Sequence, residues 1–182
     1  MKTPRVLLIA FLLSTGVLAA GEDKIIFSFS SAPANWFVVN DGVMGGVSSS
    51  TVKLENGLLV FSGQVRLENN GGFASVRSGS SEQDLSDFSG IALRIRGDGK
   101  IYALNVRTSS LPNVMYQSEF QTKTGEWTEV RVPFSQLRPT RFGQTLRGNL
   151  LEKDRIESLG FIIANKRNES FKLEVDWIKA YR

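Results

Sequence analysis

The residue types that most enzymes use for nucleophilic and metal chemistry are missing from this chain. Its 182 residues contain no histidine and no cysteine. Ser-His-Asp triads, Cys-His pairs, disulfides, and zinc, haem or iron–sulfur sites built on these side chains are therefore excluded. Any catalysis would depend on Asp, Glu, Lys, Arg, Tyr or Ser, so a binding or assembly role is favoured over an enzymatic one.

Glu119 and Glu129 are the carboxylates whose positions best suit an enzyme. They lie on the same predicted sheet face, and glycoside hydrolysis needs two carboxylates about 5–9.5 Å apart across a cleft. A glycosidase of this kind, or a lyase that uses Tyr with Arg or Lys, is the enzymatic alternative. Most surface acids are simply solvated, so we predict that the protein is not an enzyme.

These glutamates belong to a larger polar set on alternate positions of four predicted strands. If the strands are neighbours, one face carries Arg94, Arg96, Asn105, Arg107, Gln117, Glu119, Trp127, Glu129 and Arg131. Such a surface suits a glycan or a polar protein segment, and a solvated sheet face is the structural alternative. Trp127 is the best candidate for stacking on a sugar, because Tyr102 and Tyr116 fall on the apolar side of their strands.

A glycine-rich stretch from Trp36 to Ser50, WFVVNDGVMGGVSSS, is the most distinctive motif. It lacks the lysine of a phosphate-binding loop and the G-x-G-x-x-G spacing, so nucleotide binding is not predicted. The glycines allow two sharp turns, and we expect Met44 to pack inward. Both a structural corner and a ligand site are consistent with the motif.

The elements that position these residues are short alternating runs separated by Gly, Asn, Asp and Ser, a pattern typical of strands joined by tight turns. One short helical turn is expected within Leu150–Ser158. The predicted strands are Lys24–Phe29, Trp36–Val39, Thr51–Glu55, Leu58–Arg66, Phe73–Arg77, Gly90–Arg96, Lys100–Thr108, Val114–Gln121, Trp127–Val132, Leu159–Asn165 and Phe171–Tyr181. The sequence therefore predicts a single all-β domain over residues 21–182, a sandwich or jelly roll.

Residues 1–20 have the pattern of a secretory signal peptide. Lys2 and Arg5 precede an apolar run, and small residues follow it up to Ala20. The run is too short for a spanning helix. Removing this segment takes two of the 22 basic residues and no acid, which leaves 20 against 18 and a net charge of +2. We predict an exported protein, periplasmic or secreted, with no nucleic-acid partner and no stable membrane insertion.

Several motifs together resemble the complex I intermediate-associated protein 30 family. They include Asn40-Asp-Gly-Val-Met-Gly-Gly46, Asn70-Gly-Gly-Phe73, Arg96-Gly-Asp-Gly99 and Asp176-Trp-Ile178. The resemblance implies a galactose-binding-like β-sandwich, similar to carbohydrate-binding modules, and a binding role in assembly. The matching signature residues are Asn40, Asp41, Met44, Gly45, Gly46, Gly72, Phe73, Arg96, Asp98 and Tyr102.

The expected ligand is a protein partner undergoing assembly, with a glycan as the alternative. No cofactor is predicted. The one metal hypothesis is a structural calcium ion near the chain ends, as jelly-roll modules similar to this one often hold, with Asp23 and Asp176 as candidate ligands. The sequence leaves the oligomeric state open.

Overall fold

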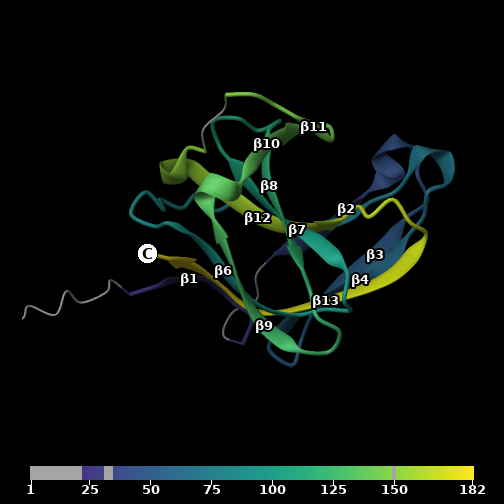
Figure 1. Cartoon of the computed structure of the whole chain (residues 1–182), viewed down its shortest axis with the longest axis horizontal. Helices are drawn as coiled ribbons and strands as arrows, with labels where there is room; N and C mark the ends of the chain where they lie inside the picture. Colours follow the sequence, from purple (N-terminus) through teal and green to yellow (C-terminus); the bar gives the residue numbers. More distant parts are fainter. Residues whose placement is uncertain (1–21, 31–34, 149–150) are drawn as a thin grey trace, which may run out of the picture.

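The protein is a sandwich of two antiparallel β-sheets, as the alternating sequence pattern predicts. The computed structural model describes residues 22–30, 35–148 and 151–182. The predicted signal peptide lies outside these residues. The two sheets pack face to face around one apolar core (Figure 1). No helix in the described part of the chain is long and apolar enough to cross a membrane.

The six-stranded sheet is organised around the long C-terminal strand, which pairs with three others. Its path is β3-β4-β13-β6-β9, and β1 also pairs with β13. The strands are β1 (Lys24–Ser28), β3 (Ser49–Glu55), β4 (Leu58–Val65), β6 (Gly90–Arg96), β9 (Trp127–Pro133) and β13 (Glu169–Tyr181).

The seven-stranded sheet has the order β11-β10-β8-β7-β12-β5-β2. Its strands are β2 (Trp36–Asn40), β5 (Ala74–Ser78), β7 (Ile101–Thr108), β8 (Met115–Gln121), β10 (Arg138–Arg141), β11 (Gln144–Thr145) and β12 (Ile156–Ile163). The described residues also form the 3-10 turns η1 (Asp41–Met44), η2 (Glu68–Asn70), η3 (Phe134–Gln136) and η4 (Lys153–Arg155).

The core lies between the sheets and is filled by the apolar members of each alternating strand. Fully buried side chains include Leu59, Phe61, Leu93, Ile95, Leu104, Val106, Phe161, Ile163, Leu173 and Val175. Tyr102 and Tyr116 are also buried, which confirms the predicted phase of their strands. Trp36 stacks on Phe161 with ring centroids 6.2 Å apart, so aromatic packing joins β2 to the middle of its sheet.

A β-bulge between Val175 and Trp177 changes the phase of β13. Phe171, Leu173 and Val175 are buried before it, and Ile178 and Ala180 are buried after it. Because a bulge inserts one extra residue, the buried side moves from odd to even positions.

The eleven predicted strands are all present, with ends displaced by up to three residues. The hairpin of β10 and β11 was not predicted. Its turn places Phe142 and Gly143 at φ values of 48° and 76°, and phenylalanine is not a residue that signals such a turn. Pro139 within β10 also argues against a strand in the sequence. The helical turn expected within residues 150–158 is the single turn η4, and residues 149–150 lie outside the described part.

On one side of the sandwich, the end strands of the two sheets lie next to each other. β2 ends the seven-stranded sheet, β3 ends the six-stranded sheet, and the two strands contact each other. Figure 1 shows β2 beside β3 on the side of the molecule away from the C-terminus. The glycine-rich motif connects these two strands, so it lies at this side of the fold.

Candidate partner-binding site

A buried carboxylate organises the glycine-rich corner. Asp41 begins η1 and is fully buried. Its Oδ1 accepts a hydrogen bond of 3.0 Å from the Ser48 amide, and its Oδ2 accepts bonds of 2.7 and 3.2 Å from the amides of Gly72 and Phe73. The Ser48 hydroxyl also donates to Oδ2. This one side chain therefore joins the segment before β3 to the segment before β5.

The pKa of Asp41 reflects this environment. Burial alone raises the pKa of a carboxylate. The hydrogen bonds from the Ser48 hydroxyl and from the amides of Gly72, Phe73 and Ser48 outweigh burial and lower the pKa below its ordinary value. The carboxylate is therefore charged at neutral pH, and its charge is compensated by donors that the fold fixes in place.

Two glycines are required because the chain passes so close to this carboxylate. A Cβ at Gly46 would lie 2.5 Å from Cγ of Asp41, and a Cβ at Gly71 would lie 2.7 Å from its Oδ2. Gly45 has a φ of 91°, which favours glycine for a different reason. The signature residues Asn40, Asp41, Gly45, Gly46, Gly72 and Phe73 thus come together at one corner, and Asn40 adds a 2.7 Å bond from the Ser50 hydroxyl.

The outer surface of this corner is apolar. Val43, Met44 and Val47 have 75%, 61% and 49% of their surface exposed. Leu67 is also exposed, and its Cδ2 would lie 3.2 Å from a Cβ at Gly72. We call these four residues the apolar corner. The expectation that Met44 packs inward is wrong, because the Asp41 carboxylate and its donors fill the interior of the turn.

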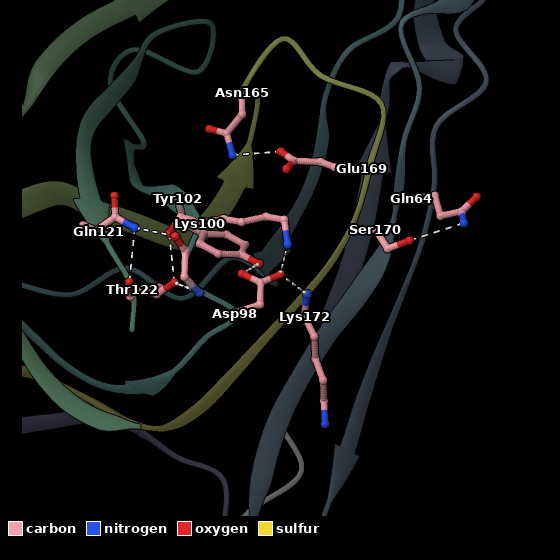
Figure 2. Close-up of polar contacts among 11 residues, drawn as sticks. Gln64, Asp98, Lys100, Tyr102, Gln121, Thr122, Asn165, Glu169, Ser170 and Lys172 are labelled. Atoms are coloured by element: carbon pink, nitrogen blue, oxygen red, sulfur yellow. Dashed lines mark hydrogen bonds and ion pairs between the residues drawn. The ribbon is translucent and has the colours of Figure 1, made fainter. Parts of the chain in front are cut away.

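A second carboxylate, Asp98, fixes the turn by which the chain passes from β6 in one sheet to β7 in the other (Figure 2). It accepts bonds of 3.0 Å from the Tyr102 hydroxyl, 2.8 Å from Lys100 Nζ and 2.9 Å from the amide of Lys172. Burial raises the pKa of Tyr102, and Asp98 raises it further, so this phenol stays a neutral donor. The Arg96-Gly-Asp-Gly99 motif therefore connects the turn between β6 and β7 to β13.

The predicted continuous polar face does not exist. β6 and β9 pair in the six-stranded sheet, whereas β7 and β8 pair in the other sheet. Alternation in a sequence indicates which face a side chain occupies and does not indicate which strands are neighbours. Glu119 and Glu129 consequently lie on different sheets, and the paired-carboxylate hypothesis is wrong.

On the six-stranded sheet, charged side chains pair with one another and cover the tryptophan. The Arg96 and Arg94 guanidinium groups lie 4.9 and 5.7 Å from the centroid of the Trp127 ring. Arg96 also pairs with Glu174, and this hydrogen bond lowers the pKa of Glu174 against the opposing effect of burial. Arg131 pairs with Glu129 at 2.9 Å. Trp127 is therefore half-buried beneath cations rather than open.

On the seven-stranded sheet, Gln117 donates a 2.9 Å hydrogen bond to Asn105 Oδ1, as their register allows. Burial lowers the pKa of Arg107, and the nearby Arg77 lowers it further. Arg77 did not figure in the sequence prediction, because its role depends on strand neighbours. The predicted residues of this sheet thus form a separate polar group.

The acids proposed for calcium are not gathered into a metal site. Asp176 lies 3.3 Å from Arg94 Nε. Across residues 22–30, 35–148 and 151–182, no group of three or more Asp, Glu, His or Cys side chains could hold a metal ion. Calcium binding by Asp23 and Asp176 stays an untested prediction.

The fold is that of carbohydrate-binding β-sandwiches. A family 11 carbohydrate-binding module from Clostridium thermocellum, solved with a β-1,3-1,4-mixed-linked tetrasaccharide, matches with a TM-score of 0.67 and 21% identity, covering 87% of this chain and 95% of that one. An agarase matches with a TM-score of 0.61 and 14% identity over 88% of this chain and 24% of its own. These structures are similar in fold.

The sequence places the chain in a particular family. Residues 25–175 match the model of complex I intermediate-associated protein 30, and the chain belongs to that family. The mitochondrial protein of this name from Mus musculus is 29% identical over 80% of this chain, and that from Drosophila melanogaster is 25% identical over 89%. The chain spans only 52% and 64% of the length of these relatives.

The names of the relatives correct one prediction. The proteins from Mus musculus, Drosophila melanogaster and Caenorhabditis briggsae are all named mitochondrial. This finding contradicts the predicted periplasmic or secreted location. That prediction depended on residues 1–20, which lie outside the described part of the chain.

Proposed function

We propose that this protein is a non-catalytic assembly factor that binds a protein partner through the apolar corner. The observation that carries the proposal is the exposure of Val43, Met44 and Val47 on a turn whose backbone the buried Asp41 carboxylate holds. Clustered exposed apolar side chains are typical of protein interaction sites. A turn that is already ordered loses little conformational entropy on binding.

The family supports a protein as the partner. The relatives are named for their association with complex I intermediates. An intermediate of a large assembly presents apolar surfaces that are later covered, and the apolar corner is suited to contact such a surface. The partner class we infer is therefore a subunit or subcomplex of complex I.

The test is co-purification of complex I subunits with the tagged full chain from membranes that contain assembly intermediates. A Val43→Ser, Met44→Ser double variant should capture at least about tenfold less, equivalent to about 1.4 kcal/mol. Its melting temperature should stay close to that of the wild type, because both side chains are exposed.

Phe142→Ser is the matched control, since Phe142 is 84% exposed on the distant β10–β11 hairpin. It should capture the same subunits as the wild type. Equal capture by the double variant, or an equal loss with Phe142→Ser, would contradict the proposed role of the apolar corner.

Glycan binding is the second candidate, and its support is the likeness in fold to carbohydrate-binding modules. Trp127 remains its predicted stacking residue. Because Arg94 and Arg96 lie over the ring, a sugar would have to displace them. A glycan-array signal that is present in the wild type and lost in Trp127→Ala would favour this function, and an unchanged signal would reject Trp127 as the binding residue.

A further inference from the structure

A groove of about 370 Å³ opens between the two end strands of the sheets. Asn35, Trp36 and Phe37 line it from the β2 side, and Val52, Lys53 and Leu54 line it from β3. We call it the edge groove. It is separate from the apolar corner, whose four residues do not line it. Figure 1 shows β2 and β3, which form its walls.

Among the strands that the structure describes, none pairs with the outer edge of β2 at this groove. The Gly79 amide donates a 2.7 Å hydrogen bond to the carbonyl of Asn35. In an antiparallel pair the bonded positions alternate, so Phe37 faces β5 and the N–H and C=O groups of Trp36 and Val38 face away from it. A row of unpaired backbone groups at a sheet edge is complementary to another extended segment.

The exposed apolar side chains of the edge groove favour an occupant with apolar side chains. Phe37 and Leu54 are each 40% exposed, and they lie on opposite walls. Successive side chains of an extended segment point to opposite sides. Every second side chain therefore points to the same side, and apolar residues at these positions would fill the groove between its two walls.

The charges at the edge groove favour acidic residues at the remaining positions. Lys53 lines the groove and forms no ion pair within the described residues. Arg77 does not line the groove, and its guanidinium carbon lies over the Phe37 ring, 4.7 Å from the centroid. Lys53 is therefore the lining residue that can pair with a carboxylate. Glu55, the acid nearest to Lys53 in the sequence, does not line the groove.

We propose that the edge groove binds an extended segment of a partner protein in which apolar and acidic residues alternate. The backbone of this segment pairs with the outer edge of β2, its apolar side chains contact Phe37 and Leu54, and its carboxylates pair with Lys53. The proposal deepens the proposed function and depends on it, because it names the kind of segment that the protein partner presents.

The probe is the synthetic peptide acetyl-Val-Glu-Val-Glu-Val-Glu-amide, titrated into the full chain and followed by calorimetry and by amide hydrogen exchange. Binding should slow exchange of the Trp36 and Val38 amides at least about tenfold, because they become hydrogen-bonded. Lys53→Glu should weaken binding about tenfold, since a charge-assisted bond is lost. The analogous peptide with Lys in place of Glu should bind at least about tenfold more weakly.

Arg167→Glu is the matched control, because Arg167 is exposed and lies outside the groove. Binding that this control weakens as much as Lys53→Glu would overturn the proposal, as would equal binding of the Lys peptide or no binding of the Glu peptide. Self-association of the chain that protects Trp36 and Val38 would also overturn it, in favour of a second copy as the occupant.

The variants also separate this proposal from the proposed function. The Val43→Ser, Met44→Ser variant should bind the peptide as the wild type does while losing capture of complex I subunits. If only the edge-groove proposal is wrong, the Val43→Ser, Met44→Ser variant should still lose capture of complex I subunits while the peptide does not bind. If only the proposed function is wrong, the peptide should still bind and Lys53→Glu should still weaken its binding, while complex I subunits are not captured.

Discussion

Asp41 and Asp98 have the same structural role in two regions of the molecule: each carboxylate holds a turn by accepting several hydrogen bonds. Each carboxylate accepts hydrogen bonds from backbone amides distant in the sequence, from Gly72 and Phe73 in one case and from Lys172 in the other. Each also accepts a bond from a hydroxyl, of Ser48 or Tyr102. Both carboxylates therefore stabilise turns between strands of the sandwich.

The two regions differ in what they present to solvent. Outside Asp98, Lys100 pairs with Asp98 itself and Lys172 pairs with Glu174. Outside Asp41, the exposed side chains are Val43, Met44 and Val47. Stability requires the carboxylate and its donors in both regions, but it does not require apolar residues in solvent. This difference supports the proposal that the residues outside Asp41 contact a partner.

The largest effect we predict is on Asp41. Asp41→Asn replaces an acceptor-only group with one that places an NH₂ group among N–H donors. It should lower the free energy of unfolding by about 3 kcal/mol, the scale for disrupting a buried charged hydrogen-bond network. Urea denaturation followed by tryptophan fluorescence measures it. Asp87→Asn, at an exposed position, should change little, and a similar loss in both variants would contradict the role of Asp41.

Low pH should destabilise the wild type more than it destabilises Asp41→Asn. The pKa of Asp41 is lower in the folded protein than its ordinary value of 3.8, so the unfolded chain binds more protons in the interval between the two values. The contribution of this carboxylate is fully present above its ordinary pKa and is lost as the pH falls through the lower, folded pKa.

Urea midpoints at pH 6, 4 and 3 test this difference. The wild-type midpoint should fall more steeply than that of Asp41→Asn, while Glu174, whose pKa is also lowered, contributes equally to both. Parallel decreases in the two proteins would show that Asp41 does not carry the acid sensitivity of the corner.

Much of the fold could be predicted because alternation in the sequence reports burial directly. The phases of β6 to β9 and the burial of Tyr102 and Tyr116 follow from it. Alternation does not identify the partner of a strand. The residues of the predicted polar face therefore lie on two different sheets. The turn at Phe142 was not predicted because phenylalanine, unlike glycine or asparagine, is not typical of a turn with positive φ.

The candidate site was located in part. The sequence motif identified the glycine corner, but its apolar composition suggested a buried Met44. The interior of the corner is occupied instead by Asp41, and that arrangement depends on Gly72 and Phe73, some 30 residues away. The edge groove could not be predicted, because Phe37 and Lys53 become neighbours only when the two sheets pack.

The smallest effect we predict is on the other carboxylate. Tyr102→Phe removes one donor from Asp98 and leaves those from Lys100 and the Lys172 amide. It should lower the free energy of unfolding by about 1 kcal/mol, the value of one hydrogen bond, and the ring should stay in the core. Tyr181→Phe, at a half-buried ring on the outer face, is the control and should change stability less. If Tyr102→Phe instead cost as much as Asp41→Asn, the turn at Asp98 would depend on a single donor, and the two carboxylates would differ in their hydrogen-bond networks as well as in the surfaces they support.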